Sequence, residues 1–252
     1  MKKLLKLEPV IDTVYKLHST LPVRRVPEMA DEAMLRELLA VNPANFEVRE
    51  RLADSLTARG AFQEACQLRL DGCLLVSDLM EETDDEFVVL DWEDSYTARA
   101  LSMVYDSAED HLVIGDFEVA AAMFELLADR DPEDHLNVAE RLVFCYVALE
   151  EWELYDETVE LLEAGTMTTR LARYWAAFRR GGEPAAAVRD AMQREDAVLF
   201  REWTAEAHEV TPEYLAAITS NKPSAEMAAR RLWLRTESFW REFPEFVAML
   251  RQ

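Results

Sequence analysis

Helical periodicity is the feature that most constrains the fold of this chain. From Asp31 onward, apolar residues recur at the spacing of an amphipathic helix, and an alternating strand pattern is almost absent. Half of the residues are hydrophobic, so the chain can bury a sizeable core. Glycine occurs only six times and forms no glycine-rich loop, which argues against nucleotide-binding α/β folds. The pattern therefore predicts an all-α fold.

The most informative segment runs from Gly115 to Pro132. Gly115 can adopt a positive φ at a helix C-terminus and so allow a tight turn into the next helix. Ala120 is small enough for the preceding helix to approach closely, and Phe117 shares a helix face with Phe124. Pro132 then closes the unit, because the residue before a proline disfavours helix.

A second segment repeats this arrangement. Gly60-Ala61-Phe62 forms the turn, Ala65 follows it, and Pro43 lies 17 residues before Gly60. The two segments resemble the tetratricopeptide repeat, an antiparallel helix pair of about 34 residues. The resemblance implies three repeat units, at 46–79, 101–134 and 135–168. The third is looser, since Glu150-Glu151-Trp152 replaces the glycine turn.

The resemblance implies one domain, a right-handed superhelical array of about seven to eleven helices. Residues 1–45 are expected to form an irregular N-terminal cap and residues 80–100 an acidic insertion. Residues 169–252 are expected to be a divergent helical part with a capping helix. The layout from Asp131-Pro132 to Thr211-Pro212-Glu213 and beyond also resembles the C-terminal part of proteins related to suppressor of tumorigenicity 7, which supports one continuous array.

The net charge of −23 comes from one stretch of the sequence. Glu81 to Gly165 contain 26 acidic residues and only three basic ones, Arg99, Arg130 and Arg141, whereas the flanking regions are balanced. A surface this acidic favours a basic partner and disfavours nucleic acid and anionic lipid. A solvated face that only keeps the protein in solution is the alternative interpretation.

Tetratricopeptide arrays bind peptides along the concave face formed by their first helices, so the resemblance implies a set of groove positions here. The candidate partner-binding residues are Glu47, Glu50, Asp54, Tyr105, Glu109 and Tyr146. Lysine, arginine and asparagine are absent from these positions, which excludes the family's clamp for a C-terminal carboxylate. An acidic groove with tyrosines fits a basic or amphipathic segment. The predicted function is therefore an interaction adaptor or chaperone-like module.

The C-terminal stretch around Trp233 and Trp240 is basic and aromatic, and both tryptophans share one helix face. A capping helix is the preferred interpretation. The alternatives are a membrane-surface element or a structural homo-oligomer that stacks end to end through this helix.

The remaining residues give no signal for catalysis or cofactor binding. Asp131, Asp134 and His135 lack the spacing of a metal site, and no nucleophile motif surrounds the serines. The three cysteines favour buried free thiols in a reducing compartment. No membrane-spanning stretch or signal peptide is recognised. We therefore expect a cytoplasmic protein that is not an enzyme and needs no metal or cofactor.

Overall fold

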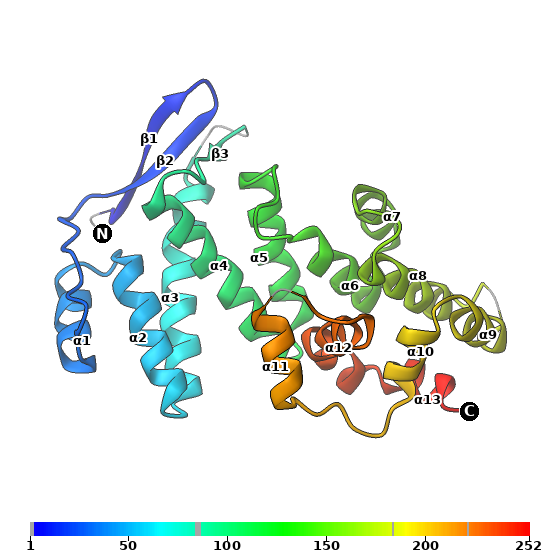
Figure 1. Cartoon of the computed structure of the whole chain (residues 1–252). Coiled ribbons are helices and arrows are strands. Elements are labelled where there is room, and N and C mark those ends of the chain that lie inside the picture. The colour runs from blue at the N-terminus through cyan, green and yellow to red at the C-terminus, as the bar shows by residue number, and fades with distance from the viewer. Residues whose placement is uncertain (1–2, 84–86, 183, 221) are drawn as a thin grey trace. The chain divides into compact units, whose positions relative to one another are not determined.

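The computed structural model describes residues 3–83, 87–182, 184–220 and 222–252 (Figure 1). This part of the chain contains thirteen helices, more than the seven to eleven predicted, and three short strands. Successive helices joined by short turns make up most of it, so the predicted all-α repeat fold is confirmed. The right-handed superhelical path stays a prediction.

The chain forms two compact units. Unit 1 consists of residues 1–111 and 119–138, and unit 2 of residues 112–118 and 139–252. The interpretation as one continuous domain stays a prediction. The first five helices are α1 (Glu32–Val41), α2 (Phe46–Ala58), α3 (Phe62–Glu81), α4 (Ser95–Ile114) and α5 (Phe117–Arg130). The others are α6 (Ala139–Leu149), α7 (Trp152–Leu161), α8 (Met167–Arg180), α9 (Ala185–Glu195), α10 (Ala197–Thr204), α11 (Pro212–Thr219), α12 (Ala225–Glu242) and α13 (Pro244–Leu250).

Unit 1 begins with a small sheet where an irregular cap was expected. β1 (Leu5–Ile11) pairs antiparallel with β2 (Val14–Ser19), which pairs parallel with β3 (Val89–Leu90). Asp12 adopts a positive φ of 46° in the two-residue turn, which suits the twist of a tight hairpin. The backbone N–H of Leu17 donates to Thr97 Oγ1 at 2.9 Å, so the sheet is anchored to α4.

The first predicted repeat, residues 46–79, corresponds to the helix pair α2 and α3. Gly60 lies in the turn with a φ of +80°, a left-handed conformation that glycine adopts without strain. The small residues Ala53 of α2 and Ala65 of α3 are 1% and 0% exposed. They belong to a core cluster that also includes Leu35 of α1, so α1, α2 and α3 pack as one layer.

The second predicted repeat, residues 101–134, covers most of α4, the turn after it, all of α5 and the turn that follows α5. Gly115 has a φ of +83° in the connecting turn, and the small positions Ala108 and Ala120 are fully buried. Phe124 packs edge-on against Tyr105, with ring centroids 5.5 Å apart. The predicted turn chemistry and close helix approach are therefore confirmed here.

The predicted acidic insertion, residues 80–100, is not a separate element, because its two ends belong to α3 and α4. α3 extends to Glu81, and α4 already begins at Ser95. Residues 84–86 lie outside the described residues. Beyond them, Val88 and Leu90 are 1% and 2% exposed and pack in the core, whereas Phe87 is 74% exposed.

Unit 2 contains the third helix pair, α6 and α7, and the remaining helices. Glu150 adopts a φ of 61° between α6 and α7, so a non-glycine residue makes this turn. Gly181 ends α8 with a φ of 65°. Thr211 and Ser224 accept hydrogen bonds from backbone N–H groups as caps of α11 and α12.

The core of unit 2 is aromatic. Trp175, at 0% exposure, is within ring-contact distance of Phe144, Phe239 and Trp240. The Trp240 Nε1–H group donates to Thr236 Oγ1 at 2.9 Å, which satisfies one buried donor. Large flat side chains from α6, α8 and α12 therefore hold this unit together.

Candidate functional site

A group of carboxylates from two helices of unit 1 is the strongest candidate site. Glu50 and Asp54 lie one helical turn apart on α2, and Asp106 and Asp110 lie one turn apart on α4. The negative charges of Glu50, Asp54 and Asp110 all act on the carboxyl group of Asp106. We call these four residues the acidic α2–α4 surface.

Two arginines at this surface are held in ion pairs. Arg99 of α4 contacts Glu50 of α2 through a short salt bridge that joins the two helices. Arg69 of α3 forms a bidentate pair with Asp110, with Nε–Oδ2 at 2.7 Å and Nη2–Oδ1 at 2.8 Å. These hydrogen bonds raise the pKa of Arg69. Four carboxylates therefore face two guanidinium groups, and the surface keeps an excess of negative charge.

Asp106 has an unusual protonation equilibrium. Burial among the surrounding helices raises its pKa to about 6, and the charges of Asp110, Glu50 and Asp54 raise it further, whereas Arg69 opposes the increase. Asp106 is nevertheless an exposed residue, so the surrounding helices shield its carboxyl group from water only in part. A cation placed here would stabilise the ionised carboxylate, because opposite charge favours the charged form.

The other predicted groove residues are distributed differently. Glu47 is in the first turn of α2, on the same face as Glu50 and Asp54. Tyr105 turns its ring toward Phe124 of α5, and Glu109 is half-buried. Tyr146 belongs to unit 2 and is only 4% exposed.

Sequence reasoning did not identify Asp106 or Asp110 as site residues. The repeat register directed attention to Tyr105 and Glu109, which are each one position away. A usable signal was present, since Arg99, Asp106 and Asp110 follow one another at intervals of seven and four residues along one helix. Their ion pairs with Glu50 and Arg69 depend on tertiary packing and leave no mark in the sequence.

The Asp131–His135 segment makes a structural turn. Asp131 accepts hydrogen bonds from the backbone N–H of His135 and contacts its Nδ1 at 2.7 Å. The His135 ring stacks on Trp92 with centroids 5.0 Å apart. Within the described residues, histidine, cysteine and acidic side chains form no cluster of three that could hold a metal ion.

The C-terminal tryptophans are part of the unit 2 core. Trp233 and Trp240 are 7% and 4% exposed, and α12 contacts α8, α10, α11 and α13. Their rings are therefore unavailable for stacking on a second molecule or on a membrane surface. In the ranges that the structure describes, every helix is too short or too polar to cross a bilayer.

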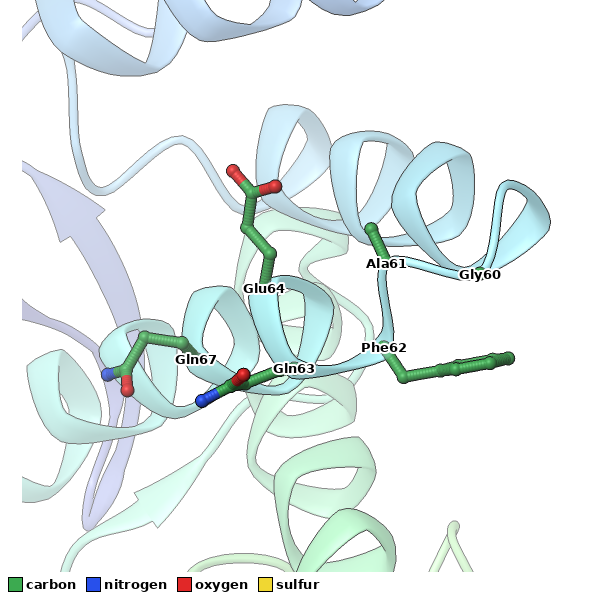
Figure 2. Close-up of a pocket in the computed structure, with 6 residues that line it drawn as sticks. All are labelled: Gly60, Ala61, Phe62, Gln63, Glu64 and Gln67. Carbon is green, nitrogen blue, oxygen red and sulfur yellow. The ribbon is translucent and has the colours of Figure 1, made fainter.

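A shallow depression lies beside the turn between α2 and α3 (Figure 2). The ring of Phe62 points away from the helix into solvent, and Gln63, Glu64 and Gln67 line the same region. Glu64 forms salt bridges with Arg36 and Arg59. The depression therefore offers an exposed aromatic ring but no free cluster of reactive groups.

Comparisons with known proteins assign no family to the chain. No protein-family model matches the sequence, and no curated protein matches it. Among solved structures, the chain is similar to a tetratricopeptide repeat protein from Parabacteroides merdae ATCC 43184. The identity is 15% and the TM-score 0.46, over 86% of this chain and 85% of that chain. The fold assignment therefore rests on the helix pairs of the structure and not on this similarity. The resemblance to suppressor of tumorigenicity 7-related proteins stays a prediction.

Proposed function

We propose that unit 1 binds a basic or amphipathic segment of a partner protein at the acidic α2–α4 surface. The observation that carries this proposal is the convergence of four carboxylates, from two helices, on one surface with only two arginines. The chain then acts as an interaction module rather than as an enzyme. Its three free thiols fit a reducing compartment such as the cytoplasm.

The chemistry of the surface specifies the partner. Mutual repulsion among Glu50, Asp54, Asp106 and Asp110 is relieved when lysine or arginine side chains approach. Glu47 extends the same face of α2 by one turn, so it belongs to the proposed site. Glu109 borders the site as a half-buried acid. Tyr105 and Tyr146 are left out, because one packs on Phe124 and the other is buried.

A homo-oligomer built through α12 is the other function predicted from the sequence. The low exposure of Trp233 and Trp240 speaks against it, because end-to-end stacking requires accessible rings. We therefore do not propose that assembly.

The test is a binding titration with a fluorescein-labelled peptide of alternating lysine and leucine, and a control peptide in which glutamate replaces lysine. The key variant is Asp54→Asn/Asp106→Asn, which leaves the Glu50–Arg99 and Asp110–Arg69 pairs in place. Its matched control is Glu37→Gln/Asp129→Asn, an equal charge change at exposed positions of the same unit.

We expect the lysine peptide to bind and its affinity to fall as salt rises from about 50 to 500 mM, since screening weakens exposed charge pairs. The key variant should weaken binding by about tenfold and the control by less than about twofold. Equal affinities for the two variants, or equal binding of the glutamate peptide, would contradict the proposal.

A further inference from the structure

Residues 21–30 join β2 to α1 and belong to no helix or strand (Figure 1). We call this segment the strap. Three side chains hold it by donating to its backbone carbonyls: Asn42 directly after α1, Asn45 at the start of α2, and Arg51 within α2. These hydrogen bonds are 2.8–3.4 Å long and end on the carbonyls of Leu21, Pro22, Arg24, Pro27 and Glu28. The α1–α2 pair therefore contacts the strap chiefly through groups that any peptide backbone provides.

One apolar side chain anchors the strap. Val26 is 5% exposed and belongs to the core cluster that includes Leu35 of α1 and Leu52 of α2. Arg24 and Arg25, directly before it, are exposed to solvent. The site thus requires an apolar residue at the Val26 position and leaves the preceding side chains free to vary.

The strap is otherwise loosely held. Within the described residues, the backbone N–H groups of residues 23–26 donate no hydrogen bond, and Pro22 and Pro27 have none to donate. Met29, near the end of the strap, is 92% exposed. A segment with one buried anchor and unpaired N–H groups opens at a low cost in free energy. The strap can therefore leave its site while α1, α2 and α3 stay packed.

We propose that the strap site, formed by Asn42, Asn45, Arg51 and the apolar cluster under Val26, binds an extended segment of a partner protein that displaces the strap. The segment must place an apolar residue before a proline, as in Val26-Pro27, because a proline keeps the residue before it extended. Such segments are preformed, so they lose little entropy on binding. The strap is then an internal occupant that a matching segment replaces.

A second copy of this chain is a poor source of that segment. At one end of the strap, the Thr20 N–H donates to the Leu4 carbonyl at 2.9 Å. At the other end, Asp31 caps α1 by accepting a hydrogen bond from the Met34 N–H at 2.9 Å. A strap fixed at both ends reaches a second molecule only if the hairpin or α1 comes away as well. The acidic α2–α4 surface takes no part in the strap site, so this proposal is independent of the proposed function.

The probe is a fluorescein-labelled peptide with the sequence of residues 20–30, in which glutamine replaces Arg24 and Arg25. It has no cationic side chain, so the acidic α2–α4 surface does not attract it. Fluorescence anisotropy measures its dissociation constant for the full chain, from about 1 to 500 µM protein. In the Val26→Asp chain a carboxylate would have to be buried in the apolar cluster, so the strap leaves its site. The peptide should bind this variant at least about tenfold more tightly than the wild type.

Two further variants, made in the Val26→Asp chain, locate the binding. Asn45→Ser/Arg51→Gln removes three donors, and serine keeps a capping oxygen for α2. It should weaken peptide binding by at least about tenfold. The matched control Arg59→Gln makes an equal charge change at the other end of α2 and should leave the affinity within about twofold.

Val26→Ala keeps the test decisive if Val26→Asp fails to fold, because it weakens the anchor without adding a charge. It should bind the peptide about threefold more tightly than the wild type. Equal affinities of the wild type and the Val26 variants would overturn the proposal, as would binding that is insensitive to Asn45→Ser/Arg51→Gln. A wild-type dimer at about 200 µM that Val26→Asp abolishes would also overturn it, since a second copy would then supply the segment.

Discussion

Single acidic residues of unit 1 perform different tasks although they look alike in the sequence. Asp110 is held by Arg69, and Asp131 caps a turn through the backbone of His135. Both carboxylates accept hydrogen bonds from nearby donors. Asp106 instead lies among other carboxylates, and its pKa is raised to about 6, chiefly by burial. The ionised form of Asp106 therefore works against folding.

This predicts that Asp106→Asn stabilises the protein near neutral pH. The pKa of Asp106 is higher in the folded state than its usual value of 3.8, so the folded state binds the proton more tightly. The cost of ionisation is complete above about pH 6 and disappears below about pH 4. We expect the thermal midpoint to rise by about 1–3 °C at pH 7.5, a small effect because the residue keeps solvent contact.

The measurement is a set of melting curves by circular dichroism at pH 7.5 and at pH 4. The gain should be lost at the lower pH. The control is Asp129→Asn, which removes an exposed carboxylate of the same unit. A gain of equal size at both pH values would show that ionisation of Asp106 is not its cause.

The close approach of helices α2, α3 and α4 in unit 1 depends on a glycine, Gly72. A Cβ atom on Gly72 of α3 would lie 2.7 Å from Met103 Cγ of α4 and 3.1 Å from Arg49 Cδ of α2. The guanidinium group of Arg49 is itself fixed, since its Nε donates to the Pro43 carbonyl at 2.7 Å. Gly72 therefore lies where three helices meet, and its lack of a side chain permits the approach.

We predict that Gly72→Ala lowers the free energy of unfolding by about 1–2 kcal/mol, because the steric cost exceeds the gain in helix propensity. Urea unfolding followed by circular dichroism measures the change. Gly165→Ala is the control, since nothing lies within 4 Å of the position of its Cβ. The destabilisation caused by Gly72→Ala should be smaller in a Met103→Ala background. An equal loss in both backgrounds would rule out the Met103 contact as the cause.

The structure shows which features of the elements could be predicted from the sequence. Gly60 and Gly115 were assigned to turns because few other residues suit a positive φ, and both adopt one. The strands were missed. β1 is interrupted by Pro9, and β3 has only two residues whose partners lie far away in the sequence. A strand of this length has no periodicity of its own and exists because of its neighbours.

The candidate site was only partly predictable for a similar reason. The acidic face of α2 was identified through Glu50 and Asp54, whose spacing alone places them together. Which residues of α4 face α2 at this surface depends on how α4 is rotated about its axis. A rotation of one position exchanges Tyr105 and Glu109 for Asp106 and Asp110, and only packing of Tyr105 against Phe124 decides between them.

The net charge is a property of the whole molecule. Fifty acidic residues outnumber 27 basic ones, and the whole surplus lies between Glu81 and Gly165, a stretch shared by both units. Self-repulsion of such a surplus opposes the compact state. Salt screens this repulsion, since the Debye length falls to about 10 Å at 0.1 M.

We therefore predict that sodium chloride raises the thermal midpoint between about 20 and 300 mM, with most of the change at the low end. Differential scanning fluorimetry measures the effect, and potassium chloride should reproduce it at equal ionic strength. Sucrose adds no ions, so it should not raise the thermal midpoint as steeply at low concentration. A midpoint that falls with salt would mean that attractive ion pairs outweigh the repulsion.

The anchoring of the N-terminal sheet has a consequence for the order in which the chain folds during synthesis. The β1–β2 hairpin leaves the ribosome before the helices of unit 1 and can pair at once, because its strands are adjacent. The acceptor of the Leu17 N–H, however, is Thr97, 80 residues further along the chain, and β3 comes only shortly before it. During translation the hairpin must therefore wait until β3 and the start of α4 have emerged before it can dock. A segment made before the helices of unit 1 is thus among the last of that unit to reach its final place.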